Sequence, residues 1–250
     1  MERKELWATL DDRIRTEFWD ADLATAQEYD IRQDPKGNLL YLPFPYITAS
    51  GGAESFFPEM YCYDSHFINM GLLAHDRADI VGDHIRNHLF MIDRYGMVLN
   101  GNRSYYLTRS QTPQLADTVV RYFEQTNDVQ LLRRAYPSLC REFREYWCAD
   151  HHSTSTGLAT NRDLGDPELR PELAAEAEIT DFTACFEGDV RRCNPVLTNA
   201  ALAQYSKLLG VIADELGLKD EAADWRTETD RRVALIGELL WDDKEGFYFD

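Results

Sequence analysis

The sequence predicts an all-α protein built as an α/α toroid. Apolar residues recur every three or four positions through most of the 250-residue chain, which is the spacing of helices that bury one face. Short turns join these stretches into antiparallel pairs, and long loops rich in aromatic and charged residues separate some of the pairs. Loops of this length in a compact domain are usually functional. A helical-repeat scaffold would give a similar pattern, but no fixed repeat period appears.

The N-terminal part combines one expected helix with a stretch of loops. A stripe of leucine and isoleucine predicts a helix over residues 4–21, and residues 1–42 are expected to form this helix and its lead-in. Proline and glycine then mark turns before the next helix, which is expected to begin near Asp64 as N-cap. Another helix is expected over residues 78–95, ending at Gly96.

The remainder of the chain predicts four further helices. One is expected to start at Pro113 and to stop at Asn127, and the next stripe covers residues 131–147, with Pro137 as a candidate break after its first turn. A long stretch of mostly polar residues, 150–170, is expected to form a loop before the last two helices. The chain then closes on an apolar, strand-like run without a cap or polar tail. We therefore expect one domain, a partial toroid and a fragment or truncated product.

Charge excludes two classes of partner. The chain has 44 acidic and 26 basic residues, a formal net charge of −18. A surface of this sign repels nucleic acid and anionic membranes, and no stretch approaches the ~20 apolar residues of a spanning helix. Asp-rich, Lys-poor composition fits a protein kept soluble at high salt, and equally an acidic cytosolic protein from a GC-rich genome.

The cysteines indicate a reducing compartment and no metal. There are five, an odd number, with no Cys-x-x-Cys pair and no histidine at zinc-ligand spacing. Reduced, mostly buried thiols are expected. The N-terminus shows no apolar core of a secretory signal, so the predicted location is the cytoplasm. We expect no cofactor and an unknown oligomeric state.

Two stretches carry side chains suited to binding a sugar. Residues 57–67 mix aromatic rings with carboxylates, including Tyr63 and Asp64; aromatic faces stack on the apolar faces of sugars, and carboxylates accept bonds from hydroxyls. Taken alone, these residues are better explained as core aromatics and a helix N-cap. Residues 100–113 gather amides, hydroxyls and arginines that suit a neutral polyol, although they could simply cap the following helix.

A third stretch is rich in carboxylates. Six of them lie between Glu172 and Asp189, and carboxylates this dense raise one another's pKa, as a general acid requires. A solvated acidic loop is the alternative, and the spacing alone does not select the working residue.

The three stretches together resemble the trehalase family. Residues 57–67 are similar to the second half of its Pro-Gly-Gly-Arg-Phe-x-Glu-x-Tyr-x-Trp-Asp-x-Tyr signature, and residues 100–111 resemble its sugar-binding loop over nearly their whole length. The resemblance spans residues 43–217 and extends to mannosylglycerate and glucosylglycerate hydrolases. It implies an (α/α)6 barrel and inverting hydrolysis of a small α-glycoside, with trehalose first.

The resemblance also implies roles for individual residues. Asp181, within Ile179-Thr180-Asp181-Phe182-Thr183, resembles the family's general acid, and Asn199 falls where a barrel helix opens. The implied substrate contacts are Tyr63, Asp64, Asn100, Arg109, Ser110, Gln111, Arg170 and Glu172. The family's base is a glutamate further toward its C-terminus, and no residue within 1–250 matches it.

Several positions depart from the family pattern around the expected pocket. Phe56 occupies the position of a sugar-binding arginine in the family, and Tyr63 replaces a tryptophan of the signature. Thr180 replaces the tryptophan before the acid, and Cys185 occupies a position where an arginine is common. These changes leave a different small α-glycoside open. Two other classes also remain open, a carbohydrate-binding relic without turnover and a helical scaffold for protein partners.

Overall fold

The computed structural model describes residues 39–49, 57–165, 170–179, 186 and 188–250, so the helix expected over 4–21 and Asp181 lie outside it. The described helices are α3 (Cys62–Ala74), α4 (Ala78–Tyr95), α5 (Leu115–Thr126), α6 (Val129–Arg141), α7 (Pro171–Ala177), α8 (Val196–Glu215) and α9 (Lys219–Leu239). Two short strands, β1 (Trp241–Asp242) and β2 (Phe247–Tyr248), pair antiparallel. The predicted all-α class is confirmed.

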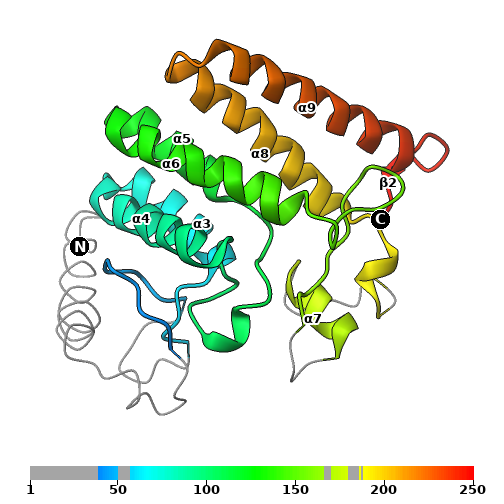
Figure 1. The fold of residues 1–250 in the computed structure, drawn as a ribbon, viewed down its shortest axis with the longest axis horizontal. Coiled ribbons are helices and arrows are strands. Elements are labelled where there is room, and N and C mark those ends of the chain that lie inside the picture. The colour runs from blue at the N-terminus through cyan, green and yellow to red at the C-terminus, as the bar shows by residue number, and fades with distance from the viewer. Residues whose placement is uncertain (1–38, 50–56, 166–169, 180–185, 187) are drawn as a thin grey trace, which may run out of the picture.

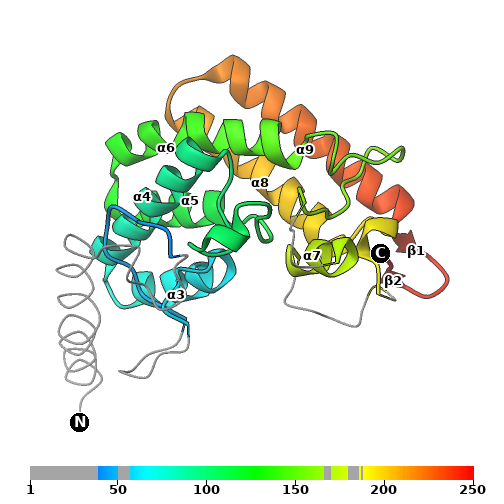
Figure 2. The same ribbon diagram turned by 60° about the horizontal axis from the view of Figure 1, so that its bottom comes forward.

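The long helices pack as successive antiparallel pairs, α3 with α4, α5 with α6, and α8 with α9. Between pairs, α5 contacts both α3 and α8, while α6 contacts α4 and α8. Figures 1 and 2 show the pairs following one another across the molecule, with the loops and α7 gathered at one end of the helices. This is the arrangement expected of consecutive pairs in an α/α toroid.

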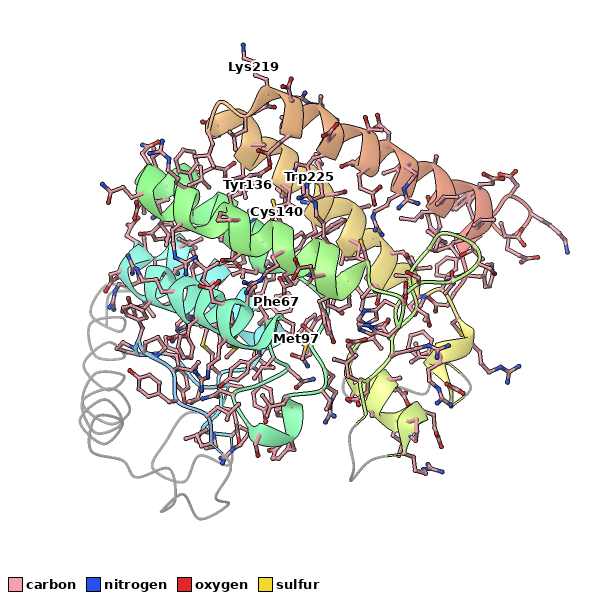
Figure 3. The ribbon with its side chains drawn as sticks, viewed as in Figure 1. Phe67, Met97, Tyr136, Cys140, Lys219 and Trp225 are labelled. Carbon is pink, nitrogen blue, oxygen red and sulfur yellow. The ribbon has the colours of Figure 1, made fainter. Side chains whose placement is uncertain are left out.

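Apolar residues from all three pairs form one continuous core. Hydrogen bonds between polar groups of buried aromatic side chains link α6 to α9. Figure 3 marks Tyr136, Cys140 and Trp225 in this region. The indole Nε1 of Trp225 donates to the Tyr136 hydroxyl at 3.0 Å, and that hydroxyl donates to Glu221 at 2.8 Å. The buried polar atoms of the two aromatics therefore satisfy each other across the helix contact.

Several predicted boundaries are confirmed by backbone geometry. Helix α4 covers the predicted residues and ends at Gly96, which adopts φ +87°, a left-handed conformation that glycine tolerates without a steric penalty. Asn127 ends α5 in the same region, with φ +53°. Pro113 lies just before α5, which begins two residues later than predicted.

Helix α3 begins two residues before the predicted N-cap. The N-cap residue is Tyr61, and its carbonyl accepts both the backbone N–H (3.1 Å) and the hydroxyl (2.6 Å) of Ser65. Asp64 therefore lies inside the first turn, where the helix dipole favours a carboxylate. Its side chain makes no capping hydrogen bond.

Helix α6 runs through Pro137 without the predicted break, and the irregularity comes later, in a π-helical turn over Glu142–Trp147. The N–H of Cys148 bonds the carbonyl of Phe143 at 3.0 Å, five residues back, so the turn is one residue wider than α-helix. This widening turns Glu142, Phe143, Tyr146 and Trp147 inward together, and all four are buried.

The C-terminal end of the described chain is a hairpin with exposed aromatic rings. The strand-like run predicted there contains β2, and Phe247 and Phe249 are more than half exposed. The Asp250 carboxylate accepts the N–H of Val196 at 2.6 Å, at the start of α8. None of the described helices has the length and apolar character to cross a membrane.

Candidate functional site

The stretch over residues 100–112, hereafter the polar loop, folds back on itself and closes against the start of α3. Its two ends meet through the Asn100 N–H, which bonds the carbonyl of Arg109 at 3.1 Å, and the Cys62 N–H bonds the carbonyl of Asn100 at 3.0 Å. Gly101 forms an isolated bridge with Tyr61. A Cβ at Gly101 would lie 3.1 Å from the Tyr61 ring, so a side chain here would push the ring away by a few tenths of an ångström.

The first predicted contacts, Tyr63 and Asp64, lie at this closure. The backbone N–H of Tyr63 donates to the Gln111 side-chain oxygen at 3.0 Å, which links α3 to the polar loop and uses the Gln111 carbonyl. The side chains of Tyr63 and Asp64 are half-buried, whereas Gln111 is buried. Within the described part of the chain, no hydrogen bond or ion pair engages the Asp64 carboxylate. Asp64 can therefore accept bonds from a ligand.

Arg109 is buried and turned toward a carboxylate of the protein. Its Nη1 lies 3.1 Å from Asp163 Oδ2, and its guanidinium stacks 5.0 Å from the centre of the Tyr106 ring. The same Asp163 oxygen accepts the Thr108 hydroxyl at 2.8 Å. Buried charges need such pairing, so this arginine orders the loop that carries Asp163.

The polar loop also holds the end of α7. The Asn100 amide donates to the carbonyl of Ala177 at 2.9 Å, and the Thr112 hydroxyl donates to the carbonyl of Ile179 at 3.0 Å. Among the residues that the structure describes, Asn100 Oδ1 is buried and has no hydrogen-bond partner. Two residues of the polar loop therefore fix the backbone that leads, two residues after Ile179, to Asp181.

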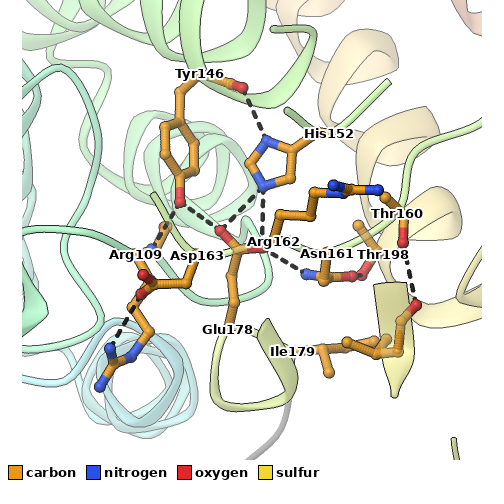
Figure 4. A network of polar contacts seen from close by, with 12 residues as sticks. Arg109, Tyr146, His152, Thr160, Asn161, Arg162, Asp163, Glu178, Ile179 and Thr198 are labelled. Carbon is orange, nitrogen blue, oxygen red and sulfur yellow. Dashed lines mark hydrogen bonds and ion pairs between the residues drawn. The ribbon is translucent and has the colours of Figure 1, made fainter. Parts of the chain in front are cut away.

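Glu178 lies in the chain between Ala177 and Ile179, the two residues whose carbonyls the polar loop bonds, and its carboxylate is fully buried (Figure 4). Its Oε1 accepts the Tyr146 hydroxyl, and its Oε2 accepts the Asn161 side-chain amide and the Arg162 backbone N–H, both at 3.0 Å. The His152 Nε2 lies 2.9 Å from Oε2 and 3.1 Å from Oε1. Both oxygens are thus saturated by donors.

The environment of His152 favours its protonated form. Nδ1 faces the Tyr146 carbonyl at 3.0 Å, while Nε2 faces the Glu178 carboxylate, so each nitrogen meets an acceptor. Burial acts to lower the pKa of His152, but the charge and hydrogen bond of Glu178 outweigh it and raise the pKa overall. Burial and the nearby Glu178 charge raise the pKa of Tyr146, which stays a donor. The cluster is a buried ion pair.

Ser110 joins the polar loop to this cluster, and Asn161 joins it to α8. The Ser110 backbone N–H donates to the Tyr146 hydroxyl at 2.9 Å, while the Ser110 hydroxyl is bonded within the loop, to the Gln111 carbonyl at 3.2 Å. The Asn161 side-chain oxygen accepts the Thr198 hydroxyl at 2.7 Å. The polar loop and α8 are therefore linked to Glu178 indirectly, through Tyr146 and Asn161.

Arg170 and Glu172 lie at the opposite end of α7. Arg170 is the N-cap residue and is exposed, with its Nε 3.6 Å from Glu172 Oε1; Glu172 also lies 3.8 Å from Arg191. Asn199 has a different environment: its amide exchanges two bonds with the Ala159 backbone, at 2.8 and 2.9 Å, which attaches the loop to α8.

Four residues at the site were not singled out from the sequence, namely Tyr146, His152, Asn161 and Glu178. Glu178 belongs to the carboxylate-rich stretch, and that density was the only signal pointing to it. Helix α7 was also missed, although Pro171 at its first position and Glu172 in its first turn are a helix-start signature. In the part of the chain that the structure describes, no cluster of three or more possible ligands could hold a metal ion.

Comparison with known proteins agrees with this assembly. The family model for trehalase matches residues 4–172 and 175–250. The chain belongs to the trehalase family. Rabbit trehalase is 29% identical over 98% of this chain and 46% of its own length, and human trehalase is 29% identical over 85% and 42%. This trehalase-family chain therefore spans about half the length of the curated relatives it matches.

The fold is shared with a solved trehalase. Neutral trehalase Nth1 from Saccharomyces cerevisiae superposes with a TM-score of 0.73 at 23% identity, over 85% of this chain and 52% of that one. This likeness confirms the predicted helical toroid class, of which the described helix pairs form a part.

Proposed function

We propose that this trehalase-family chain takes part in the inverting hydrolysis of a small α-glycoside, with trehalose as the first substrate. The observation that carries the proposal is the attachment of the polar loop to the end of α7. Through Asn100 and Thr112, the loop that resembles the family's sugar-binding loop contacts the backbone leading to Asp181. The candidate binding groups and the residues that directly precede the candidate acid thereby belong to one assembly.

In the proposed mechanism, Asp181 protonates the glycosidic oxygen as the bond to the anomeric carbon breaks. A second carboxylate removes a proton from water, and the resulting oxygen attacks the anomeric carbon from the opposite face. Inverting enzymes hold these two carboxyl groups ~6.5–9.5 Å apart to admit that water. The family resemblance assigns the second group to a glutamate that has no counterpart within residues 1–250.

The proposed binding residues divide into two groups according to burial. Tyr63, Asp64, Arg170 and Glu172 remain partly or fully accessible and can contact sugar directly. The remainder are buried and bonded within the protein, where they hold the wall of the site in shape: Asn100, Arg109, Ser110 and Gln111. Such preorganisation lowers the entropy lost when the substrate is oriented.

The test is release of glucose from trehalose by the full-length gene product, in a form that includes the second carboxylate, and by its Asp181→Asn variant. We expect hydrolysis by the wild type and a loss of ~10²-fold or more in kcat for the variant, since it removes the proton donor. Asp214→Asn is the matched control, because this aspartate is exposed on α8 and pairs only with Arg226 among the described residues. Unchanged turnover by Asp181→Asn would remove Asp181 from the mechanism.

Proton NMR at early times tests the stereochemistry. Inversion at one anomeric carbon of trehalose gives equal initial amounts of α- and β-glucose, whereas retention gives α-glucose only. Calorimetry with trehalose separates hydrolysis from the relic alternative, which predicts heat of binding without glucose release. A parallel assay with mannosylglycerate and glucosylglycerate determines the substrate preference.

We also propose a cytoplasmic location, on the basis of five cysteines without a paired or zinc-binding pattern, as is usual in a reducing compartment. The relatives include proteins named cytosolic neutral trehalase, from Kluyveromyces lactis, and periplasmic trehalase, from Escherichia coli. Fractionation of cells that express the protein at its natural level distinguishes the two compartments.

A further inference from the structure

We propose that Glu178 is a positioning residue, which fixes residues 177–179, the backbone that directly precedes the candidate acid Asp181 in the chain. The proposal rests on the function proposed above, because it takes Asp181 as the general acid. It concerns a residue that the sequence analysis did not single out as a site residue.

Glu178 itself is unsuited to proton transfer. Its side chain is fully buried, and both of its oxygens already accept hydrogen bonds from Tyr146, His152, Asn161 and the Arg162 backbone. A group so enclosed reaches neither a glycosidic oxygen nor a water molecule. Its chemical contribution must therefore act through the structure around it.

The donors that surround Glu178 come from elements distant in sequence. Tyr146 belongs to the π-helical turn after α6, whereas His152, Asn161 and Arg162 belong to the loop that follows that turn. Figure 4 shows the side chains of Tyr146, His152 and Asn161 converging on the carboxylate from several sides. Charge-assisted hydrogen bonds of this kind are stronger than bonds between neutral groups. The carboxylate is consequently fixed in all directions.

The backbone on each side of Glu178 is fixed as well. Ala177 is held by Asn100 and Ile179 by Thr112, so three consecutive residues are tied to surrounding elements immediately before the Asp181 segment. The two backbone bonds involve neutral groups, whereas the carboxylate takes part in an ion pair with His152. Loss of the charge at Glu178 thus removes the strongest of the three attachments.

The decisive variant is Glu178→Gln, which keeps the shape and removes the charge. Its amide nitrogen would face groups that are themselves donors, so the side chain can no longer satisfy all four partners. Because displacement of a catalytic group by ~1 Å can cost ~10²-fold, we expect kcat for trehalose to fall by ~10²-fold while KM changes by less than ~3-fold.

Glu142→Gln is the matched control. Glu142 is equally buried, but its partners are the Val98 N–H and the Tyr205 hydroxyl and lie outside α7. We expect its kcat to stay within ~2-fold of wild type. Tyr146→Phe offers a milder change, because it removes one donor and keeps the ring; kcat is expected to fall by ~10-fold, the equivalent of one hydrogen bond.

Hydrogen exchange supplies a readout that needs no activity. In Glu178→Gln, the amides of residues 171–179 are expected to exchange faster than in wild type, while Glu142→Gln leaves them unchanged. If wild type does not hydrolyse trehalose, the proposed function fails, and the exchange comparison alone decides the anchoring. Should Glu178→Gln fold with wild-type kcat or with unchanged exchange over 171–179, the proposal is overturned. If it does not fold, Tyr146→Phe decides by the same two measurements.

Discussion

Glu142 makes the stability of this protein depend on pH in a way that a single substitution can isolate. The side chain is 1% exposed, at the start of the π-helical turn, and its two oxygens accept the Val98 N–H and the Tyr205 hydroxyl, both at 2.8 Å. Burial raises its pKa to about 7 from the ordinary value of 4.5, although both hydrogen bonds oppose the shift.

The sign follows from counting protons. Between pH 4.5 and about 7 the folded protein keeps the Glu142 proton and the unfolded chain loses it, so the free energy of unfolding falls as pH rises. The stabilising contribution is complete below pH 4.5 and is lost by about pH 7. A gap of about 2.5 pH units, at ~1.36 kcal/mol for each, corresponds to ~3 kcal/mol.

Glu142→Gln removes this dependence, because the amide resembles the protonated acid. Its oxygen can accept from Val98, and its NH₂ can donate to the Tyr205 hydroxyl. Urea unfolding of both proteins between pH ~4 and ~8 measures the difference in unfolding free energy, in which the titration of all other groups cancels. We expect the variant to gain ~3 kcal/mol on wild type across this range. Parallel stability curves would refute the assignment of a raised pKa to Glu142.

Two further predictions concern local stability. Gly71 lies inside α3, and a Cβ there would have no atom within 4 Å, so Gly71→Ala is expected to stabilise the protein by ~0.5–1 kcal/mol. Gly96 has φ +87°, so Gly96→Ala is expected to destabilise the protein by ~1 kcal/mol. Thermal unfolding measures both effects, and an equal effect of the two substitutions would contradict the helix-end geometry. Asp163→Asn removes the buried charge facing Arg109 and is expected to cost ~3 kcal/mol in urea unfolding, a value that a cost below ~1 kcal/mol would disprove.

Local pattern predicted the long helices well. The stripes of apolar residues identified every described helix longer than ten residues, and Gly96 and Asn127 ended their helices because both residues tolerate left-handed backbone. Pro137 was misinterpreted, since tertiary packing carries α6 through it. Helix α7 has only seven residues, too few to establish a stripe.

The candidate site was predictable in composition and not in connectivity. The residue types in the polar loop indicated hydrogen bonding, but not their partners. Asn100 bonds a carbonyl 77 residues away, and Thr112 bonds one 67 residues away. Such pairings follow from how helices pack and leave no periodic trace in the chain. The cluster around Glu178 escaped prediction for the same reason, because its members are scattered over Tyr146, His152, Asn161 and Arg162.

The double duty of the polar loop limits how this protein can be redesigned. A randomised library that targets Asn100 and Gln111 would chiefly yield misassembled variants, because these two side chains hold neighbouring elements together. Tyr63 and Asp64 project from the first turn of a helix whose own start does not depend on them. Selection for a new sugar preference should therefore begin at those two positions and spare the loop.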